Sequence, residues 1–77
     1  MIREHDRIVL RTDLSAEKLE AGDVGTVVHI HGEGKAYEIE FVALDGETAA
    51  VVTLEASKIR PVHKGEITHA RELATAS

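Results

Sequence analysis

The sequence contains no cysteine, which excludes disulfide bonds and thiolate metal sites. It has no tryptophan and only one phenylalanine and one tyrosine, too few to form a platform on which the bases of a single-stranded nucleic acid could stack. No apolar run is long enough to span a membrane or to resemble a signal peptide, so we expect a cytoplasmic protein. Its 77 residues suffice for one small domain and leave no room for a large substrate cavity.

Basic residues are also scarce: nine lysines and arginines stand against fourteen aspartates and glutamates, giving a formal net charge of −5. Non-specific binding of nucleic acid depends on a basic surface that neutralises phosphates. The charge therefore argues against nucleic acid as a partner. It suits either solubility or a protein partner with a basic surface. We expect no membrane association.

The sequence does contain the alternation of apolar and polar residues that is typical of β-strands. Between the first two strands lies a charged loop at 12–21, and residues 55–58 suit a single helical turn. Pro61 cannot donate to a sheet ladder, which places the last strand at a sheet edge. This pattern predicts an all-β fold, a small five-stranded SH3-like barrel with a short helical turn before the last strand. The expected strands are 6–11, 26–31, 36–42, 49–54 and 59–62.

Two turn signals independently predict the register of the central strands. Asp45-Gly46 is typical of a type I′ turn, and residues 32–35 suit a four-residue hairpin loop. Both place the same alternate residues of 36–42 on one apolar face, and a slip of one residue would turn all of them outward. The expected pairs are Phe41 with Ala50, Ile39 with Val52, Tyr37 with Leu54, Ile30 with Tyr37 and Val28 with Ile39. The expected core is Ile8, Leu10, Val24, Val28, Ile30, Tyr37, Ile39, Phe41, Val52, Leu54 and Ile59.

We expect the barrel to comprise residues 1–62 and to be followed by a flexible C-terminal segment at 63–77. The spacing of Ile67, Ala70 and Leu73 suits a helix, while residues 67–69 would also suit a strand. A third alternative is a segment that becomes ordered on a partner.

Several stretches of the chain resemble known families. Residues 19–28 are similar to the glycine-centred loop and strand of KOW-type and other SH3-like barrels. A fuller pattern, which covers nearly the whole chain, resembles the small bacterial DUF4926 family of domains of unknown function. The resemblance implies an SH3-like barrel and a prokaryotic cytoplasmic protein, but no activity, and it leaves room for an antitoxin-like or accessory-subunit role. The stretches that carry it are 21–31, 34–41, 44–48, 51–57 and 60–62.

The predicted registers also define an outer sheet face, which is unusually apolar for a surface in contact with water. Exposed apolar patches on small proteins tend to mark contact sites. The alternative is that the 12–21 loop or the C-terminal segment folds over this face. We predict that a protein partner or a second copy binds there, and that the contact residues are Val27, His29, Glu38, Glu40, Val42, Ala49 and Val51.

Three residues of this region could in principle bind a metal ion. His29 and His31 lie on one side of a strand, about 7 Å apart at two residues' rise, and Glu38 lies across from His29. Two histidines and a carboxylate are ligands that zinc accepts. The sequence offers no further ligand of evident spacing, and an exposed His–Glu pair explains the same residues. We therefore predict no metal and no cofactor.

Catalysis finds little support in the sequence. Glu38 and Glu40 are paired carboxylates, but they would lie on an open sheet, where neither burial nor a like charge shifts a pKa usefully. Ser15 and Ser57 have no histidine that the sequence places as a base. We predict no catalytic residues and no enzyme.

These observations predict a non-enzymatic protein-binding module or small accessory subunit, with an antitoxin-like role as one form of it. It would act through the outer sheet face and the 12–21 loop. The alternative is an RNA- or ribosome-associated barrel of the KOW kind. That alternative requires a cluster of basic residues near the strand ends, drawn from Arg3, Arg7, Arg11, Lys58, Arg60 and Lys64.

Overall fold

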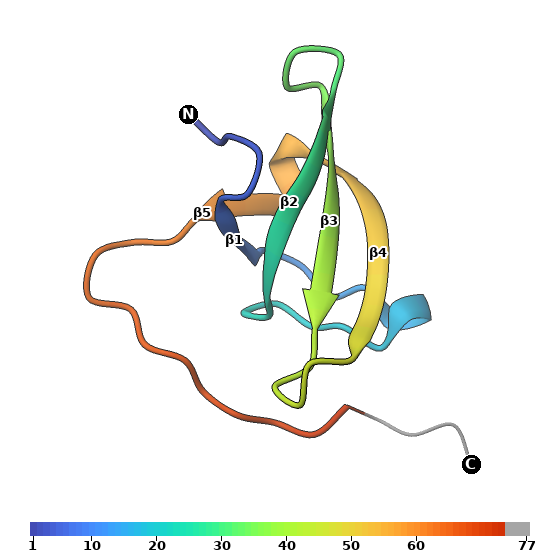
Figure 1. Cartoon of the computed structure of the whole chain (residues 1–77), viewed down its shortest axis with the longest axis vertical. Helices are drawn as coiled ribbons and strands as arrows, with labels where there is room; N and C mark the ends of the chain where they lie inside the picture. The colour runs from blue at the N-terminus through green and yellow to red at the C-terminus, as the bar shows by residue number, and fades with distance from the viewer. Residues whose placement is uncertain (74–77) are drawn as a thin grey trace.

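A computed structural model describes residues 1–73 of the chain (Figure 1). The described residues form five strands and two single turns of 3-10 helix. In chain order these are β1 (Arg7–Leu10), η1 (Ser15–Glu17), β2 (Val24–His31), β3 (Ala36–Val42), β4 (Thr48–Glu55), η2 (Ala56–Lys58) and β5 (Ile59–Pro61). Within these residues, no helix is long and apolar enough to cross a membrane.

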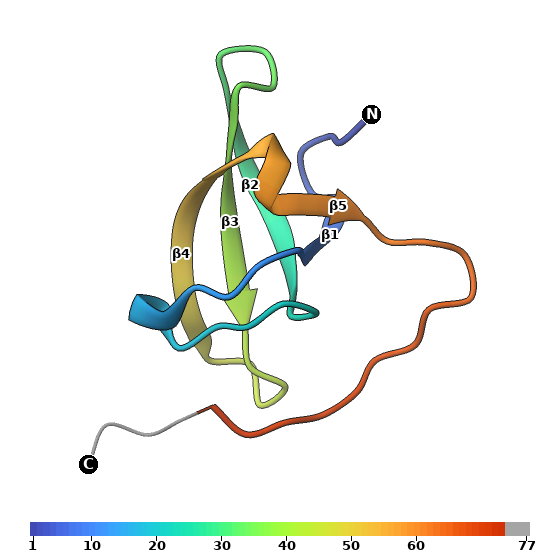
Figure 2. The ribbon, with the colours of Figure 1, turned by 180° about the vertical axis from the view of Figure 1, so that it is seen from behind.

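The strands pair in the order β4-β3-β2-β1-β5, with every neighbouring pair antiparallel. The sheet curves round on itself, so that the short strands β1 and β5 run across the long strands β2, β3 and β4 (Figure 2). The single turn η2 directly precedes β5. The prediction of an all-β, five-stranded SH3-like barrel with a helical turn before the last strand is confirmed.

The core lies inside this curve and draws side chains from all five strands. Leu19 is the exception, because it reaches the core from the loop between β1 and β2, where it forms a bridge with Leu14. Ile30 and Val52 were predicted in the core, and they pack against it as half-buried residues. The buried cluster is Ile8, Leu10, Leu19, Val27, Tyr37, Ile39, Phe41, Leu54 and Ile59.

The pairing of β3 with β4 follows the predicted register over most of its length. Phe41 pairs with Ala50, Ile39 with Val52 and Tyr37 with Leu54. The loop of residues 32–35 also joins β2 to β3 as predicted, with Ile30 opposite Tyr37. Both turn signals therefore place β3 correctly next to its turns, but the predicted pair of Val28 with Ile39 is not formed.

The turn between β3 and β4 is longer than the predicted type I′ turn. The Gly46 N–H donates to the Ala43 carbonyl at 2.8 Å, and the Ala43 N–H donates to the Glu47 carbonyl at 2.8 Å. Gly46 has a φ of 95°, whereas Asp45 has no positive φ and instead accepts a hydrogen bond from the Glu47 N–H. This is a three-residue loop that needs only one left-handed residue. The register then shifts between Phe41 and Val42, and Ala49 is the extra residue.

β2 carries an irregularity that the sequence prediction missed. The register with β3 shifts between Val27 and His29, so that Val27 pairs with Ile39 and Val28 has no partner there. Val27 is 0% exposed and Val28 is 38% exposed, the reverse of the prediction. A bulge bends a strand and increases its twist, and β2 must curve in order to pair with β3 along one end and with β1 along the other.

Val24 was also predicted in the core, and it is 41% exposed. Its neighbour Gly25 pairs with Ile8 and lies against the core side chains Ile39 and Phe41. Because successive residues of a strand point to opposite faces, Val24 points outward.

The chain after β5 forms neither a helix nor a strand in the described residues 62–73. It leaves the barrel as a wide arc and returns to the end where the β3–β4 turn lies (Figure 1). The described part of the predicted segment 63–77 thus forms neither the helix nor the strand that its sequence would suit. Residues 74–77 of that prediction lie outside the described residues.

Candidate functional site

The outer face of β2, β3 and β4 carries six of the seven predicted contact residues. Val42, Ala49, Val51 and His29 are exposed there, and Glu38 and Glu40 are half-buried. Val27 is not on this face, because the bulge in β2 turns it into the core. The prediction that Val27 lies on the outer face was wrong.

Sequence reasoning missed Val24 and Val28, which take the place of Val27 on the outer face. A usable signal was present in Gly25. A glycine inside a strand often marks a close approach of another chain segment, and a Cβ at Gly25 would meet the Ile39 Cγ2 at 2.5 Å. Gly25 therefore faces the core, and Val27 two residues later shares its face.

A groove of about 850 Å³ lies at the end of the outer face near Val24, Val42 and Ala49. One wall is the returning C-terminal segment at 67–73, and the other is formed by the start of β2 and the turn after β3. The groove has apolar side chains that solvent reaches, since Leu44 is 86% exposed and Ile67 is 92% exposed. The C-terminal segment thus borders this part of the face without covering it.

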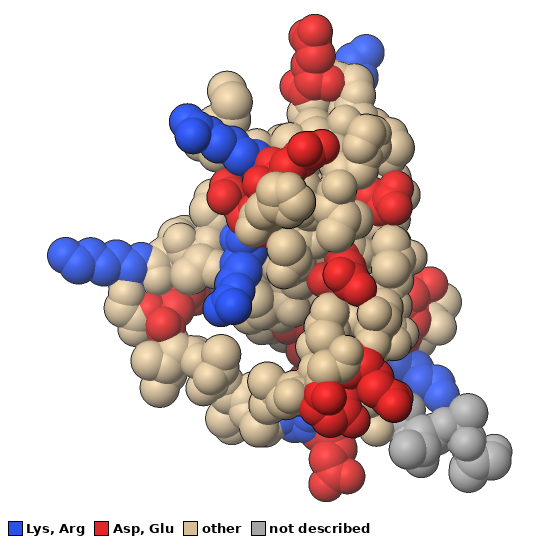
Figure 3. Space-filling view, in the orientation of Figure 1, with Lys and Arg blue, Asp and Glu red and all other residues tan. Residues whose placement is uncertain are grey.

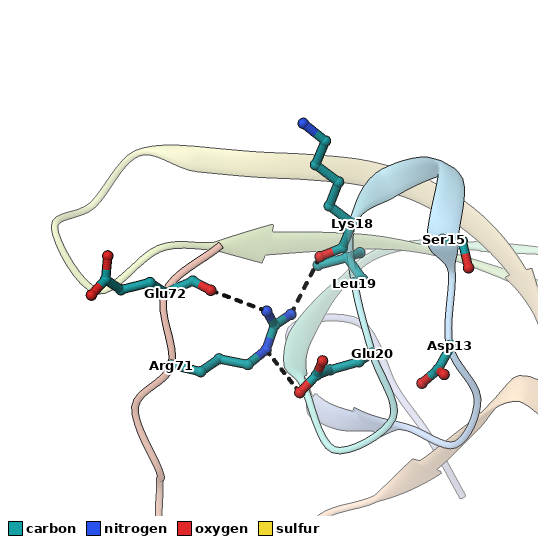
Figure 4. Close-up of a pocket in the computed structure, with 7 residues that line it drawn as sticks. All are labelled: Asp13, Ser15, Lys18, Leu19, Glu20, Arg71 and Glu72. Atoms are coloured by element: carbon teal, nitrogen blue, oxygen red, sulfur yellow. Dashed lines mark hydrogen bonds and ion pairs between the residues drawn. The ribbon is translucent and has the colours of Figure 1, made fainter. Parts of the chain in front are cut away.

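Arg71 ties the C-terminal segment to the loop before β2. Its Nε donates to the Asp23 Oδ1 at 2.9 Å, and its Nη2 donates to Asp23 Oδ2. The same guanidinium lies 3.4 Å from the Glu20 carboxylate and 3.4 Å from the Lys18 carbonyl oxygen (Figure 4). A planar guanidinium that binds both oxygens of one carboxylate fixes the geometry of a contact.

The charge state of Asp23 reflects this contact. Burial alone would raise the pKa of the Asp23 carboxyl, but the hydrogen bonds from Arg71 and from the Glu20 N–H together hold that pKa below its ordinary value. Asp23 is therefore ionised at neutral pH and holds the far end of the C-terminal segment.

A second ion pair holds the near end of the same segment. Arg60 of β5 donates from Nη1 to Glu66 Oε1 at 3.0 Å and from Nη2 to Glu66 Oε2 at 2.7 Å. The His63 N–H also donates to Glu66. The hydrogen bonds from Arg60, with the help of the His63 N–H, lower the pKa of Glu66 to about 2. The described part of the segment is thus anchored at Glu66 and at Arg71, and residues 67–70 lie between these two anchors along the groove.

The rim of the groove is acidic. Glu20, Asp45 and Glu72 are exposed carboxylates among its lining residues, and the one lining arginine, Arg71, is paired with Asp23. Acidic side chains also gather around the lower end of the molecule, where the β3–β4 turn lies (Figure 3). A groove that combines exposed apolar side chains with carboxylates suits a partner that presents apolar side chains beside lysine or arginine.

The loop at 12–21, predicted to take part in binding, is folded on itself. The Ala21 N–H donates to the Asp13 carboxylate at 2.9 Å, and the Leu14–Leu19 bridge closes the loop. With Arg71, its residues also border a smaller hollow beside the groove (Figure 4). The loop therefore contributes to the surface near the groove rather than covering the outer face.

The histidines of the outer face are exposed and have separate acidic neighbours. The rings of His29 and His31 meet edge to face, with centroids 4.5 Å apart. Although Glu38 pairs with His29 along the sheet, its carboxylate lies 3.5 Å from His31, and His29 lies 3.7 Å from Glu4. No group of three or more histidines and acids within residues 1–73 is arranged to hold a metal ion.

Glu38 and Glu40 do not form a shared acid pair. Glu40 accepts a hydrogen bond from the Thr48 hydroxyl at 2.8 Å, and Glu38 faces His31. Ser15 begins η1 and Ser57 lies in η2, both exposed.

On the face seen in Figure 3, lysines and arginines are spread among acidic and neutral side chains and form no single patch. Arg60 is also already engaged with Glu66.

The chain was compared with known proteins at three levels. A family model described as "Domain of unknown function (DUF4926)" matches residues 4–61. No curated protein and no solved structure matches the chain. The matched region begins before β1 and ends at the last residue of β5, so it spans the whole barrel.

Proposed function

The chain belongs to the DUF4926 family, a domain of unknown function, and from the geometry of its own surface we propose that it is a non-enzymatic protein-binding module. The binding site is the groove beside the C-terminal segment, with the part of the outer face that borders it at Val42 and Ala49. In this proposal the chain is an accessory subunit or an antitoxin-like protein that uses this surface to bind its partner. We propose the cytoplasm as its location, in keeping with the absence of cysteine.

The observation that carries this proposal is the set of apolar side chains left in contact with water around one groove. Val24, Val42, Leu44 and Ile67 are all exposed and all line it. Single exposed apolar residues are common, but a contiguous group beside a concave surface is typical of contact sites. The C-terminal segment, held by its two ion pairs, keeps one wall of the groove in place.

The charge of the rim defines the chemistry of the partner. Glu20, Asp45 and Glu72 border the groove, and the whole chain carries a net charge of −5. We therefore propose that the occupant is a protein segment in which apolar residues alternate with lysine or arginine. Its apolar side chains would cover Val24 and Val42, and its basic side chains would lie beside the rim carboxylates.

A peptide of alternating leucine and lysine is a direct probe of this proposal, with alternating leucine and glutamate as the matched control. We expect the basic peptide to shift the amide resonances of Val24, Val42, Leu44 and Ile67. The variant Val42→Lys should weaken binding about tenfold, because it removes a buried valine contact and adds a like charge. Thr53→Lys, on the same outer face but outside the groove, adds the same charge and should have little effect.

Three results would contradict the proposal. The first is equal binding of the two peptides, and the second is equal weakening by the two lysine variants. The third is submicromolar binding of RNA at physiological salt, which would instead favour the KOW-like alternative. A partner captured from the native host counts as support only if the purified protein binds the wild type and fails to bind Val42→Lys.

A further inference from the structure

The two edges of the sheet are protected very differently. β5 is three residues long and contains Arg60 and Pro61, features that discourage the addition of another strand. β4 is eight residues long, and its only charged residue is Glu55 at its end. Natural proteins usually shield a long edge with lysine, proline, a bulge or a covering segment. β4 has no lysine or proline, and its bulge lies near its start at Ala49. Within residues 1–73, β4 pairs with β3 alone.

The alternation of an antiparallel ladder shows which backbone groups of β4 face this free edge. The Ala43 N–H donates to the Glu47 carbonyl across the turn. The backbone N–H and C=O groups of Ala43, and of every second residue before it in β3, therefore point toward β4. One of these residues is Ile39, the partner of Val52. Consequently the N–H and C=O groups of Val52 point toward β3, while those of Val51 and Thr53 point away from β3 toward the free edge. A short edge offering these groups remains for another strand.

We infer that β4 pairs antiparallel with β4 of a second copy of this chain across a two-fold axis at Val51, forming a homodimer with one continuous sheet. This surface is the free edge of β4, which meets the proposed groove only at Ala49, and the inference goes beyond the proposed function. In this register Val51 lies opposite Val51 of the second copy, so the outward N–H and C=O groups of these two residues meet. Ala49, the extra residue of the bulge, lies near Thr53 of the other copy.

The side chains of β4 suit its own copy. The same register brings Ala50 opposite Val52 on the inner side, where both are only half-buried in one chain, and pairing would cover them further. No charged residue lies between Thr48 and Leu54, so no like charges meet along the paired strands. β-branched and small side chains dominate this run, and such residues pack well across neighbouring strands.

The assembly is closed. Both β4 edges are used in the dimer, and the edges that remain are the two β5 strands with their Pro61. A two-fold contact of this kind stops at two copies rather than growing into a fibre. This arrangement accounts for the absence of lysine and proline from β4 and for Pro61 in β5.

The two copies carry the same charge and therefore repel each other, and the one charged residue of β4, Glu55, lies at the end of the strand. Each chain carries a net charge of −5. Salt screens such repulsion, so added salt should strengthen the dimer. The same salt would weaken the binding of a basic partner in the groove, because it screens the attraction between opposite charges. The two proposals therefore respond to salt in opposite directions.

The experiment follows the protein alone, without peptide, over a concentration series up to about 1 mM, because an interface of one strand pair is small and weak. Sedimentation velocity should show a monomer converting to a dimer. Hydrogen exchange at the Val51 and Thr53 amides should slow as concentration rises, with little change at Val52, whose N–H already bonds within the monomer.

Val51→Pro is the decisive variant. It removes an N–H that faces the free edge and leaves the ladder to β3 intact, so the fold should survive while dimerisation falls at least tenfold. Val51→Thr keeps the N–H and the β-branched shape and should dimerise as the wild type does. If the proline variant does not fold, Val51→Lys serves instead, because it keeps the N–H and places like charges opposite each other.

The proposal is overturned if the wild type stays monomeric over the whole series, if Val51 and Thr53 exchange at rates independent of concentration, or if the folded Val51→Pro or Val51→Lys protein dimerises as well as the wild type. Because no peptide is present, none of these results bears on the groove.

Discussion

Val27 and Val28 are chemically identical neighbours with opposite environments, one fully buried and the other partly exposed. Threonine has nearly the shape of valine and adds one hydroxyl. In Val27→Thr this hydroxyl would enter an apolar core, and we expect a loss of about 1–3 kcal/mol in the free energy of unfolding. In Val28→Thr the hydroxyl remains in water, and the change should stay within about 0.5 kcal/mol. Urea denaturation of the two variants measures the difference, and equal values would mean that the bulge in β2 is absent.

Gly25 and Gly46 are needed for different physical reasons. At Gly25 an added Cβ would lie 2.5 Å from the Ile39 Cγ2 and 3.0 Å from the Phe41 Cε1, so Gly25→Ala should cost about 1–3 kcal/mol through overpacking. At Gly46 nothing lies within 4 Å of such a Cβ, and only its φ of 95° opposes a side chain. Gly46→Ala should therefore cost about 1 kcal/mol, which lowers the melting temperature by roughly 4–8 °C.

Asparagine separates the two cases, because it tolerates a left-handed backbone better than other residues with a Cβ. Gly46→Asn should melt closer to the wild type than Gly46→Ala does, whereas Gly25→Asn should be worse than Gly25→Ala. Thermal melts of the four variants check this, and a rescue by asparagine at Gly25 would contradict the steric explanation.

At the residue scale, the sequence predicts the outer face well wherever polar and apolar residues alternate. Glu38 and Glu40 lie between the buried residues of β3, and the structure places them outward as expected. In β2, two β-branched apolar residues follow each other, and either could face the core. Two adjacent valines do not reveal the bulge. Strict alternation therefore predicted Val28 in the core and Val27 on the outer face, whereas the structure has the reverse.

At the scale of elements, the turns predicted the pairing of strands, because each turn fixes which residues can meet. The loop at 32–35 predicted the pair of Ile30 with Tyr37, and the Asp45-Gly46 signal predicted three pairs of β3 with β4, although the second turn has a different length. Beyond the bulge in β2 the predicted pair of Val28 with Ile39 was wrong. The course of residues 62–73 could not be predicted in the same way. It depends on the ion pairs of Arg60 with Glu66 and of Arg71 with Asp23. Neither pair follows from the alternation of apolar and polar residues along the chain.

The turn after β5 should respond to acid. Hydrogen bonds from Arg60 hold the pKa of Glu66 at about 2, below its ordinary value of 4.5. A carboxyl whose pKa is lowered in the folded protein contributes stability above pH 4.5, and loses it as the pH falls from 4.5 toward 2. We therefore expect this anchor of the C-terminal segment to release over that interval.

Carbon-detected NMR titration of the Glu66 carboxyl measures the pKa directly. Arg60→Gln should return it toward 4.5, and Arg60→Lys, which keeps the charge but loses the two-pronged contact, should give an intermediate value. If Arg60→Gln leaves the Glu66 titration unchanged, the ion pair does not hold this turn in solution.

At the scale of the whole molecule, the barrel and the C-terminal segment make separable contributions. Every residue of the buried core lies before Val62, and the segment is held to the barrel mainly through the pairs Arg60–Glu66 and Arg71–Asp23. Surface ion pairs contribute little to folding stability, typically about 0–1 kcal/mol each. A chain that ends at Val62 should therefore fold and melt within several degrees of the full chain.

The same truncation tests whether the segment serves binding, and it does so without a change in net charge. Residues 63–77 contain two basic residues, Lys64 and Arg71, and two acidic residues, Glu66 and Glu72, so the net charge stays at −5. Removal of the segment also removes Ile67 and Leu73 from the wall of the groove. We expect the shortened protein to keep its melting temperature but bind the leucine–lysine peptide at least several-fold more weakly, as measured by fluorescence anisotropy. Unchanged binding would locate the contact on the sheet face alone, and loss of the fold would contradict the division of the chain at Val62.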